Sequence, residues 1–193
     1  NPCGVSALKN NLDSYKSALE SDPISAFGGI ISCNYKITQK LALILDKIFL
    51  EVIVADGFEK KALKILKSKK NLRLIDSSKI TFNEVWKFNS LDNFTLIQTE
   101  DKKKISKKDF RIVSKKKPSK TQLDNLMFAF NVCRYTKSNA IVLASNKSTI
   151  GIGSGQPSRL DSCEIAINKM NKFSKIKKDI VAASDAFFPF VDG

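Results

Sequence analysis

Short apolar runs alternate with helical patterns through the first part of the chain, and this alternation constrains its fold more than any other feature. Apolar residues recur at three- and four-residue steps over 6–19, which predicts an amphipathic helix that Asp22-Pro23 terminates. We expect further helices over 38–50 and 58–67, and strands near 27–31, 52–55 and 72–75. Buried strands that alternate with helices are typical of an α/β fold with a largely parallel or mixed sheet.

The pattern changes at about residue 80 and returns after Pro118. Residues 94–97 and 110–113 are candidate strands around a Lys-rich turn, and we interpret the stretch as a connector. Beyond it we expect helices over 121–135 and 159–170 and strands at 140–143, 149–152 and 180–183, with a hairpin turn at Asn146-Lys147. We therefore divide the chain into a first unit, 1–117, which includes the connector (about 80–117), and an incomplete second unit, 118–193.

The formal net charge of +14 favours an anionic partner, such as nucleic acid, an acidic membrane surface or a small molecule. Most of this charge is Lys, in runs at 67–70, 102–104 and 115–117 that are typical of solvated loops, and only four Arg are present. We favour a solvated Lys-rich surface and keep a basic nucleic-acid-binding module as the alternative function. No apolar run has the length of roughly 18–20 residues that spans a bilayer.

The chain has four cysteines and no histidine. The cysteines are widely spaced and form no Cys-x-x-Cys pair, so a zinc site would need distant thiolates alone, and we predict no metal site. Free thiols in a reducing cytoplasm are the expected state. Histidine-based acid–base chemistry is not available from these residues.

The segment 151–159, Gly-Ile-Gly-Ser-Gly-Gln-Pro-Ser-Arg, is the most informative string. Its alternating glycines do not match the dinucleotide-binding fingerprint, but they allow close backbone approach to a ligand. Ser158 is placed to cap the following helix, and Arg159 adds a positive charge where free N–H groups favour an anion. A tight turn without a ligand is an equally good interpretation of the string alone.

Two further strings lie beside apolar strands. Lys137-Ser138-Asn139 falls where a helix gives way to a strand, a common place for active-site polar groups, although a helix C-cap at Asn139 is the favoured local interpretation. Asp185 is followed by three phenylalanines within five residues. Core filling is the simplest role for these rings, and stacking on a heteroaromatic ligand is the alternative.

Together these strings resemble AICAR transformylase, the folate-dependent formyl-transfer domain of a bifunctional purine-biosynthesis enzyme that also carries IMP cyclohydrolase. The resemblance runs from Asn1 to Gly193, with a divergent stretch at about 80–115. The strings that carry it are Asn-Pro-Cys-Gly at 1, Asp-Pro-x-Ser-Ala-Phe-Gly-Gly-Ile-Ile at 22, Phe-x-Glu-Val-Ile-x-Ala at 49, Lys-Ser-Asn-Ala-Ile-Val at 137, Gly-x-Gly-x-Gly-Gln-x-Ser-Arg at 151 and Ser-Asp-Ala-Phe-Phe-Pro-Phe-x-Asp-Gly at 184.

The resemblance implies cytidine-deaminase-like α/β/α units without the deaminase zinc. It implies transfer of a formyl group from 10-formyltetrahydrofolate to the 5-amino group of AICAR, giving FAICAR on the route to IMP. It also implies a cytoplasmic homodimer with active sites at the subunit interface and with neither a nucleic-acid nor a membrane partner. The family's catalytic Lys-His pair directly precedes its Asn-Pro-Cys-Gly string, so we expect this chain to be an internal piece that is inactive alone.

Residue by residue, the resemblance implies two sets of contacts. The expected AICAR contacts are Gly28, Glu51, Asn139 (also a supporting catalytic residue) and Arg159. The expected folate-side positions are Leu160, Phe187 and Asp192. Ser138 and Asp185 fall near a potassium site of some members, to which we assign no ion here, and Lys137 is a possible helper without an assigned role.

Overall fold

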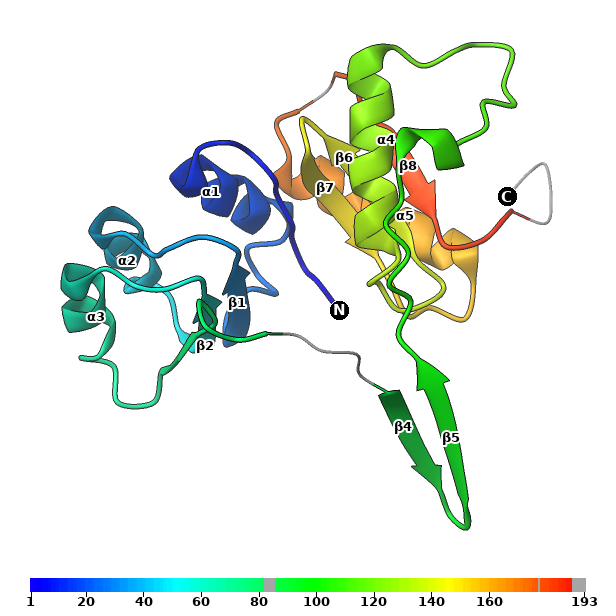
Figure 1. Cartoon of the computed structure of the whole chain (residues 1–193). Coiled ribbons are helices and arrows are strands. Elements are labelled where there is room, and N and C mark those ends of the chain that lie inside the picture. Colours follow the sequence, from blue (N-terminus) through cyan, green and yellow to red (C-terminus); the bar gives the residue numbers. More distant parts are fainter. Residues whose placement is uncertain (82–85, 177, 189–193) are drawn as a thin grey trace.

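The structure is a computed structural model that describes residues 1–81, 86–176 and 178–188. Its ribbon contains two separate sheets with helices, and a hairpin that projects away from both of them (Figure 1). The first part of the chain forms α1 (Asn11–Ser21), β1 (Gly29–Cys33), α2 (Gln39–Leu45), β2 (Leu50–Ala55), α3 (Lys60–Leu66) and β3 (Arg73–Asp76). Strands β1, β2 and β3 are parallel neighbours in that order, so the parallel α/β prediction is confirmed.

The first sheet packs its helices on one face. Leu41 and Leu45 of α2 and Leu66 of α3 are buried in the same core as Ile53 of β2, and Tyr15 of α1 joins them. The helix predicted over 38–50 is too long at its C-terminal end. It ends at Leu45 because the chain turns there through backbone hydrogen bonds that span three residues, such as that from the Ile48 amide to the Leu45 carbonyl. The chain then enters β2 at the buried Leu50.

The helix predicted over 6–19 begins later than expected. The Asn10 side chain accepts hydrogen bonds from the amides of Leu12 and Asp13 and so starts α1 at Asn11. Upstream of that cap the chain is extended, and the Val5 carbonyl accepts the Thr149 amide at 2.9 Å. Residues of the N-terminal segment therefore pair with the second sheet. The division at 117/118 stays a prediction.

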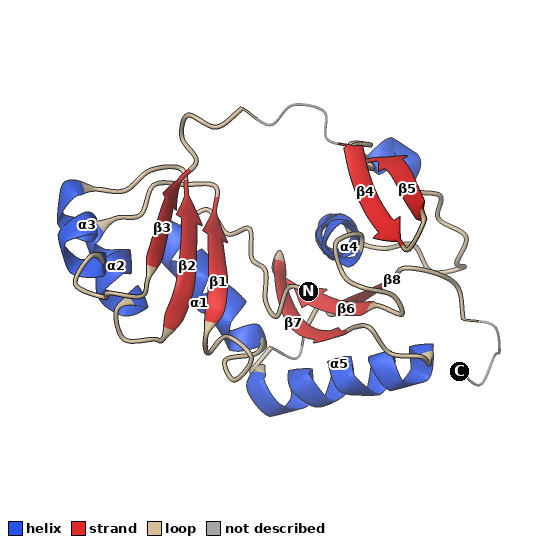
Figure 2. Cartoon of the chain, turned by 90° about the horizontal axis from the view of Figure 1, so that it is seen from below, coloured by secondary structure: helices blue, strands red, loops and turns tan. Residues whose placement is uncertain are grey.

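The second sheet lies between two helices. It contains β6 (Ile141–Ser145), β7 (Ser148–Gly153) and β8 (Val181–Ser184), in the antiparallel order β7-β6-β8. Helix α4 (Lys120–Cys133) covers one face through Ala129 and Val132, and α5 (Arg159–Phe173) covers the other through Ala166. The predicted hairpin turn at Asn146-Lys147 is confirmed, with φ of 48° and 52°. This part is a three-layer α/β/α arrangement (Figure 2).

The connector differs most from expectation. It contains an antiparallel hairpin of β4 (Trp86–Leu91) and β5 (Phe94–Thr99) and a short 3₁₀ turn, η1 (Lys107–Asp109). The predicted strand at 94–97 is confirmed as part of β5, whereas the strand predicted at 110–113 is wrong, because those residues take no strand partner and run past α4 instead. Every residue of β4 and β5 is exposed. Among the described residues, no helix is long and apolar enough to cross a bilayer.

Candidate functional site

The clearest constellation of predicted residues lies at one end of the second sheet. Strands β6 and β8 are antiparallel with Ile141 opposite Ser184, so Asn139, just before β6, lies near Asp185, just after β8. The Asp185 carboxylate accepts the Ala140 amide at 3.0 Å. Arg159 reaches this corner from the first turn of α5, whose N-terminus is capped by Ser158 as predicted. Three segments distant in sequence therefore meet here.

Arg159 makes polar contacts with three other side chains at this end of the sheet. Its guanidinium donates to the Asn139 side-chain oxygen at 2.7 Å and to the Ser184 hydroxyl at 2.8 Å, and it forms an ion pair with Asp185. Only 11% of the Arg159 side chain and 19% of the Asp185 side chain are exposed. These bonds use three of the five guanidinium N–H donors, so the group retains capacity for a ligand acceptor. We call Asn139, Arg159, Ser184 and Asp185 the Arg159 cluster.

Asn139 is the hub of the cluster rather than a helix cap. Helix α4 ends with Arg134 at its C-cap, so the favoured local interpretation of Asn139 is wrong. The Asn139 side-chain amide donates to the carbonyls of Gln156 and Pro157 at 2.9 and 2.8 Å. It thereby fixes the loop after the glycine-rich strand and orients its own oxygen toward Arg159.

Asp185 stays ionised in this setting. Burial by itself opposes its charge, but hydrogen bonds from Ser138, from the Ala140 amide and from Arg159 outweigh burial and lower the pKa of Asp185 to about 2. The cluster therefore pairs a fixed negative charge with a fixed positive one. An acceptor on a ligand would meet a guanidinium whose charge is already balanced and whose direction is set.

Two apolar side chains flank the cluster. Leu160 follows Arg159 in α5 and is exposed, and Phe187 follows the Ser184-Asp185 pair with 80% of its surface exposed. Phe188 is also exposed, so core filling does not describe these two rings in this chain. Asp192, the remaining folate-side prediction, lies outside the described residues. An exposed ring beside a polar corner suits stacking on a flat ligand.

The other two predicted AICAR contacts lie on the first sheet. Gly28 has a φ of 69° and donates its amide to the Phe49 carbonyl at 2.9 Å, and Glu51 is exposed at the start of β2. Figures 1 and 2 show the first sheet on the opposite side of the molecule from β8, the strand that precedes Asp185. Among the described residues, no hydrogen bond or ion pair joins Gly28 or Glu51 to the Arg159 cluster. The structure therefore brings Asn139 and Arg159 together and leaves Gly28 and Glu51 in a second group.

Lys137 and Ser138 adjoin the cluster. The Lys137 amide donates to the Asn1 side chain at 2.7 Å, and its carbonyl accepts the Gly155 amide at 2.8 Å. Within the described ranges, no group of three or more His, Cys, Asp or Glu residues could hold a metal ion. Burial raises the pKa of the nearby Cys133 thiol to about 11, so this cysteine is not a nucleophile at neutral pH.

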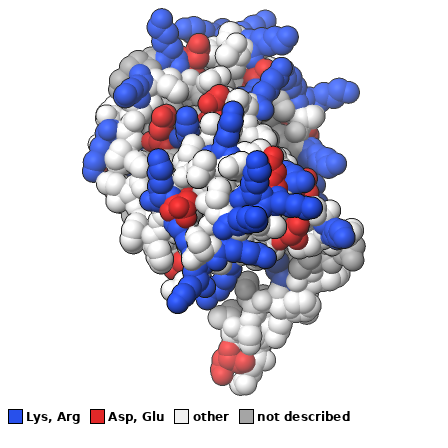
Figure 3. Space-filling view, turned by 90° about the vertical axis from the view of Figure 1, so that its left-hand side faces the viewer, with Lys and Arg blue, Asp and Glu red and all other residues white. Residues whose placement is uncertain are grey.

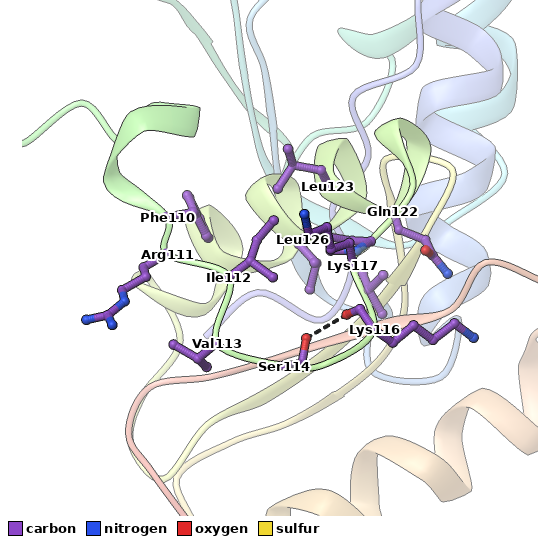
Figure 4. A pocket seen from close by; sticks show the side chains of 12 residues that line it. Phe110, Arg111, Ile112, Val113, Ser114, Lys116, Lys117, Gln122, Leu123 and Leu126 are labelled. Atoms are coloured by element: carbon purple, nitrogen blue, oxygen red, sulfur yellow. Dashed lines mark hydrogen bonds between the residues drawn. The ribbon is translucent and has the colours of Figure 1, made fainter.

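Sequence reasoning missed Ser184 as a cluster member, although it stands directly before Asp185 in the string that carries the resemblance. It also missed a groove of about 440 Å³ between residues 110–118 and α4. Figure 4 shows Ile112 and Leu126 beside this space and Arg111 extending away from it. None of the predicted site residues lines the groove.

The positive charge forms no single stripe on the face that Figure 3 shows. Lys and Arg are spread over it with Asp and Glu among them, and the part that projects at the bottom carries few basic side chains. This distribution fits the Lys-rich solvated surface that we favoured.

Comparison with known proteins gives a family model, described as AICARFT/IMPCHase bienzyme, that matches residues 1–169. Among similar proteins is the bifunctional purine biosynthesis protein PurH of Chlorobium phaeobacteroides (strain BS1), 40% identical over 193 residues. PurH of Acetivibrio thermocellus is 42% identical over 195 residues, and these two matches cover 100% of this chain and 37% of each relative. PurH of Wigglesworthia glossinidia brevipalpis is 45% identical over 192 residues, covering 99% of this chain and 36% of the relative. The chain thus spans little more than a third of the length of these relatives.

Proposed function

The chain belongs to the AICARFT/IMPCHase bienzyme family, and on that premise we propose that it is part of a formyltransferase in purine synthesis. The reaction would move the formyl group of 10-formyltetrahydrofolate to the 5-amino group of AICAR, giving FAICAR and tetrahydrofolate. The parent protein would also carry IMP cyclohydrolase. The observation that carries this proposal is the Arg159 cluster, in which residues matched to AICAR contacts are already joined by hydrogen bonds.

The cluster has the chemistry to hold a polar substrate. Asn139 and Ser184 fix the Arg159 guanidinium, and Asp185 balances its charge, so an acceptor of AICAR would bind without reorganisation of these side chains. Gly28 and Glu51 would supply contacts from the first sheet. Because the two groups lie apart in one chain, we propose a homodimer in which each AICAR site takes residues from two copies.

The folate side would lie around Leu160 and Phe187, with Asp192 as a further contact. Exposed apolar side chains beside the Arg159 cluster would place the pterin ring near the AICAR amine. The two α/β units would be cytidine-deaminase-like and would hold no zinc. We propose a cytoplasmic location, which the four free cysteines support.

The chemical step needs more than these residues. The AICAR amine is a weak nucleophile because its lone pair is delocalised into the imidazole ring, so proton transfer and charge stabilisation at the tetrahedral centre are required. This chain has no histidine. We propose that the segment binds and orients the substrates, that a Lys-His pair elsewhere in the parent supplies the proton chemistry, and that the 193 residues alone do not turn over.

The test is a formyl-transfer assay on the full-length protein that contains this segment. With AICAR and 10-formyltetrahydrofolate together we expect FAICAR and tetrahydrofolate in equal amounts, and with either substrate omitted we expect neither. A full-length, folded protein that forms no FAICAR would refute the proposed function. Turnover by the isolated segment would refute only the proposed division of labour.

A further inference from the structure

A buried carboxylate begins the loop that carries Gly28. Asp22 directly follows α1, and only 3% of its surface is exposed. Its two oxygens accept the Ser25 amide at 3.0 Å and the Ser25 hydroxyl at 2.7 Å. Burial opposes ionisation, but Lys169 and Ser25 outweigh it and keep the pKa of Asp22 below its ordinary value. Asp22 is therefore a buried, ionised carboxylate that holds the start of this loop in place, and we call it the Asp22 anchor.

The partner of this anchor comes from the other half of the chain. The Lys169 ammonium lies 2.7 Å from Asp22 and projects from α5, the helix that begins with Arg159. Helix α5 has little freedom to move, because it packs backbone to backbone on β7. A Cβ on Gly151 would come within 2.1 Å of the Ala166 carbonyl oxygen, and one on Gly153 within 1.8 Å of that of Ser162. The ion pair thus ties the loop to a fixed helix.

Backbone hydrogen bonds continue from the Asp22–Ser25 contact along the loop to Gly28. After Ser25 the Phe27 amide donates to the Ile24 carbonyl, and the Gly29 amide donates to the Ala26 carbonyl at 3.1 Å. The Gly28 amide donates to the Phe49 carbonyl at the start of the sheet. The position of Gly28 is therefore set from one side by the sheet and from the other by the Asp22 anchor.

We propose that Asp22 and Lys169 are a positioning pair, which fixes the substrate-binding Gly28 loop against the helix that carries Arg159. The inference rests on the proposed function and adds two residues to it. Neither residue is among the predicted AICAR or folate contacts. Their effect is on the relative placement of the two groups of AICAR contacts, which must be correct in each copy if a site is built from two copies.

The two partners are not equivalent. Removal of Lys169 leaves a carboxylate buried with Ser25 as its remaining donor, which is costly. Removal of Asp22 leaves an ammonium whose side chain is 31% exposed and has access to water. We therefore expect Lys169→Met to have the larger effect, and Lys169→Arg, which keeps the charge, to have a small one.

The experiment compares variants of the full-length protein in the formyl-transfer assay. Asp22→Asn and Lys169→Met are expected to raise the KM for AICAR by roughly tenfold or more while kcat changes by less than about twofold, because the loop acts on binding rather than on chemistry. The double variant should have a KM for AICAR no higher than that of Lys169→Met alone, since the two single variants remove the same interaction. Lys172→Met removes the same charge from an exposed position of the same helix and serves as the control.

Amide hydrogen exchange gives a readout that does not depend on activity. Lys169→Met should accelerate exchange at Ser25, Phe27 and Gly28 relative to Lys172→Met, with the amides of β6 unchanged. An unchanged KM with unchanged loop exchange would overturn the proposal, as would equal losses of kcat and of folded protein without a KM change. If Lys169→Met does not fold, Asp22→Asn decides by the same criteria. A wild-type protein without transferase activity refutes the proposed function, and loop exchange alone then decides the role of the pair.

Discussion

The Asn139 side-chain oxygen accepts a hydrogen bond from the Arg159 guanidinium at 2.7 Å, across 20 residues of sequence. Because Asn139 also donates to two loop carbonyls, and Arg159 also binds Ser184 and Asp185, neither side chain is free to turn. A ligand that binds this pair meets groups whose directions are already fixed, so little entropy is lost on binding.

Replacing Arg159 by Ala should weaken AICAR binding strongly. The change removes a charge-assisted donor and leaves Asp185 without its counter-ion, and we expect the KM for AICAR to rise about 10–100-fold. Steady-state kinetics of the full-length protein check this. Arg111→Ala removes an exposed guanidinium that points away from the groove and should leave the KM unchanged. An Arg159→Ala protein with the wild-type KM would remove Arg159 from the site.

Asp185 should contribute stability that acid removes. Its pKa is lowered from 3.8 to about 2 in the folded chain, so its contribution is present above about pH 4 and is lost as the pH falls toward about 2. The shift sets an upper bound of about 2 kcal/mol, which solvent screening of this partly exposed group reduces. Urea unfolding of wild type and Asp185→Asn across this range should show the difference between their free energies of unfolding shrinking as the pH falls. A difference independent of pH would show that the carboxylate is not held ionised.

The glycines of β7 should tolerate no side chain. In Gly153→Ala the new methyl would come within 1.8 Å of the Ser162 carbonyl oxygen, and we expect a loss of about 3 kcal/mol or more in the free energy of unfolding. Gly155→Ala is the matched control. Its φ of 68° makes it strained, but the methyl would meet only the Lys137 side chain at 3.8 Å, and a cost of about 1–2 kcal/mol follows. Equal losses in the two variants would show that α5 can move off β7.

Exposed and buried large apolar residues should differ sharply in their contribution to the free energy of unfolding. Phe88 in β4 is 63% exposed, and Phe88→Ser should change the free energy of unfolding of this chain by less than about 0.5 kcal/mol. Ile53 in β2 is fully buried, and Ile53→Ala should cost about 2–5 kcal/mol. Denaturant titration of both variants checks the contrast. A large loss from Phe88→Ser would mean that the hairpin packs against the rest of the chain.

The elements that could be predicted from the sequence are those set by local periodicity or turn chemistry. The three parallel strands and the hairpin turn at Asn146-Lys147 are examples, because apolar runs and residues that tolerate positive φ mark them directly. The start of α1 was missed because residues near Val5 pair with β7, and no local pattern records a partner so distant along the chain. The residues at 110–113 have the composition of a strand but no strand beside them.

In the candidate site, too, the features set by local sequence could be predicted, and those that depend on tertiary contacts could not. Arg159 and the Ser158 cap follow from the string that contains them, since a helix N-terminus after a glycine-rich strand is a local feature. The hub role of Asn139 could not be predicted locally, because it depends on Gln156 and Pro157 approaching from another loop. That no hydrogen bond joins Gly28 to the Arg159 cluster among the described residues is likewise a property of the tertiary structure alone.

The exposed hairpin has a consequence for how copies of this chain meet. Lys87 and Asp92 are its only charged residues in a chain of net charge +14, so mutual repulsion, which acts over most of the surface, is weakest there. Its sheet contains only β4 and β5 within the described residues, which leaves strand edges able to accept further strands. Raising the ionic strength screens the repulsion elsewhere but leaves the apolar attraction intact. Salting out should therefore yield ordered, β-rich aggregates that grow from the hairpin rather than an amorphous precipitate.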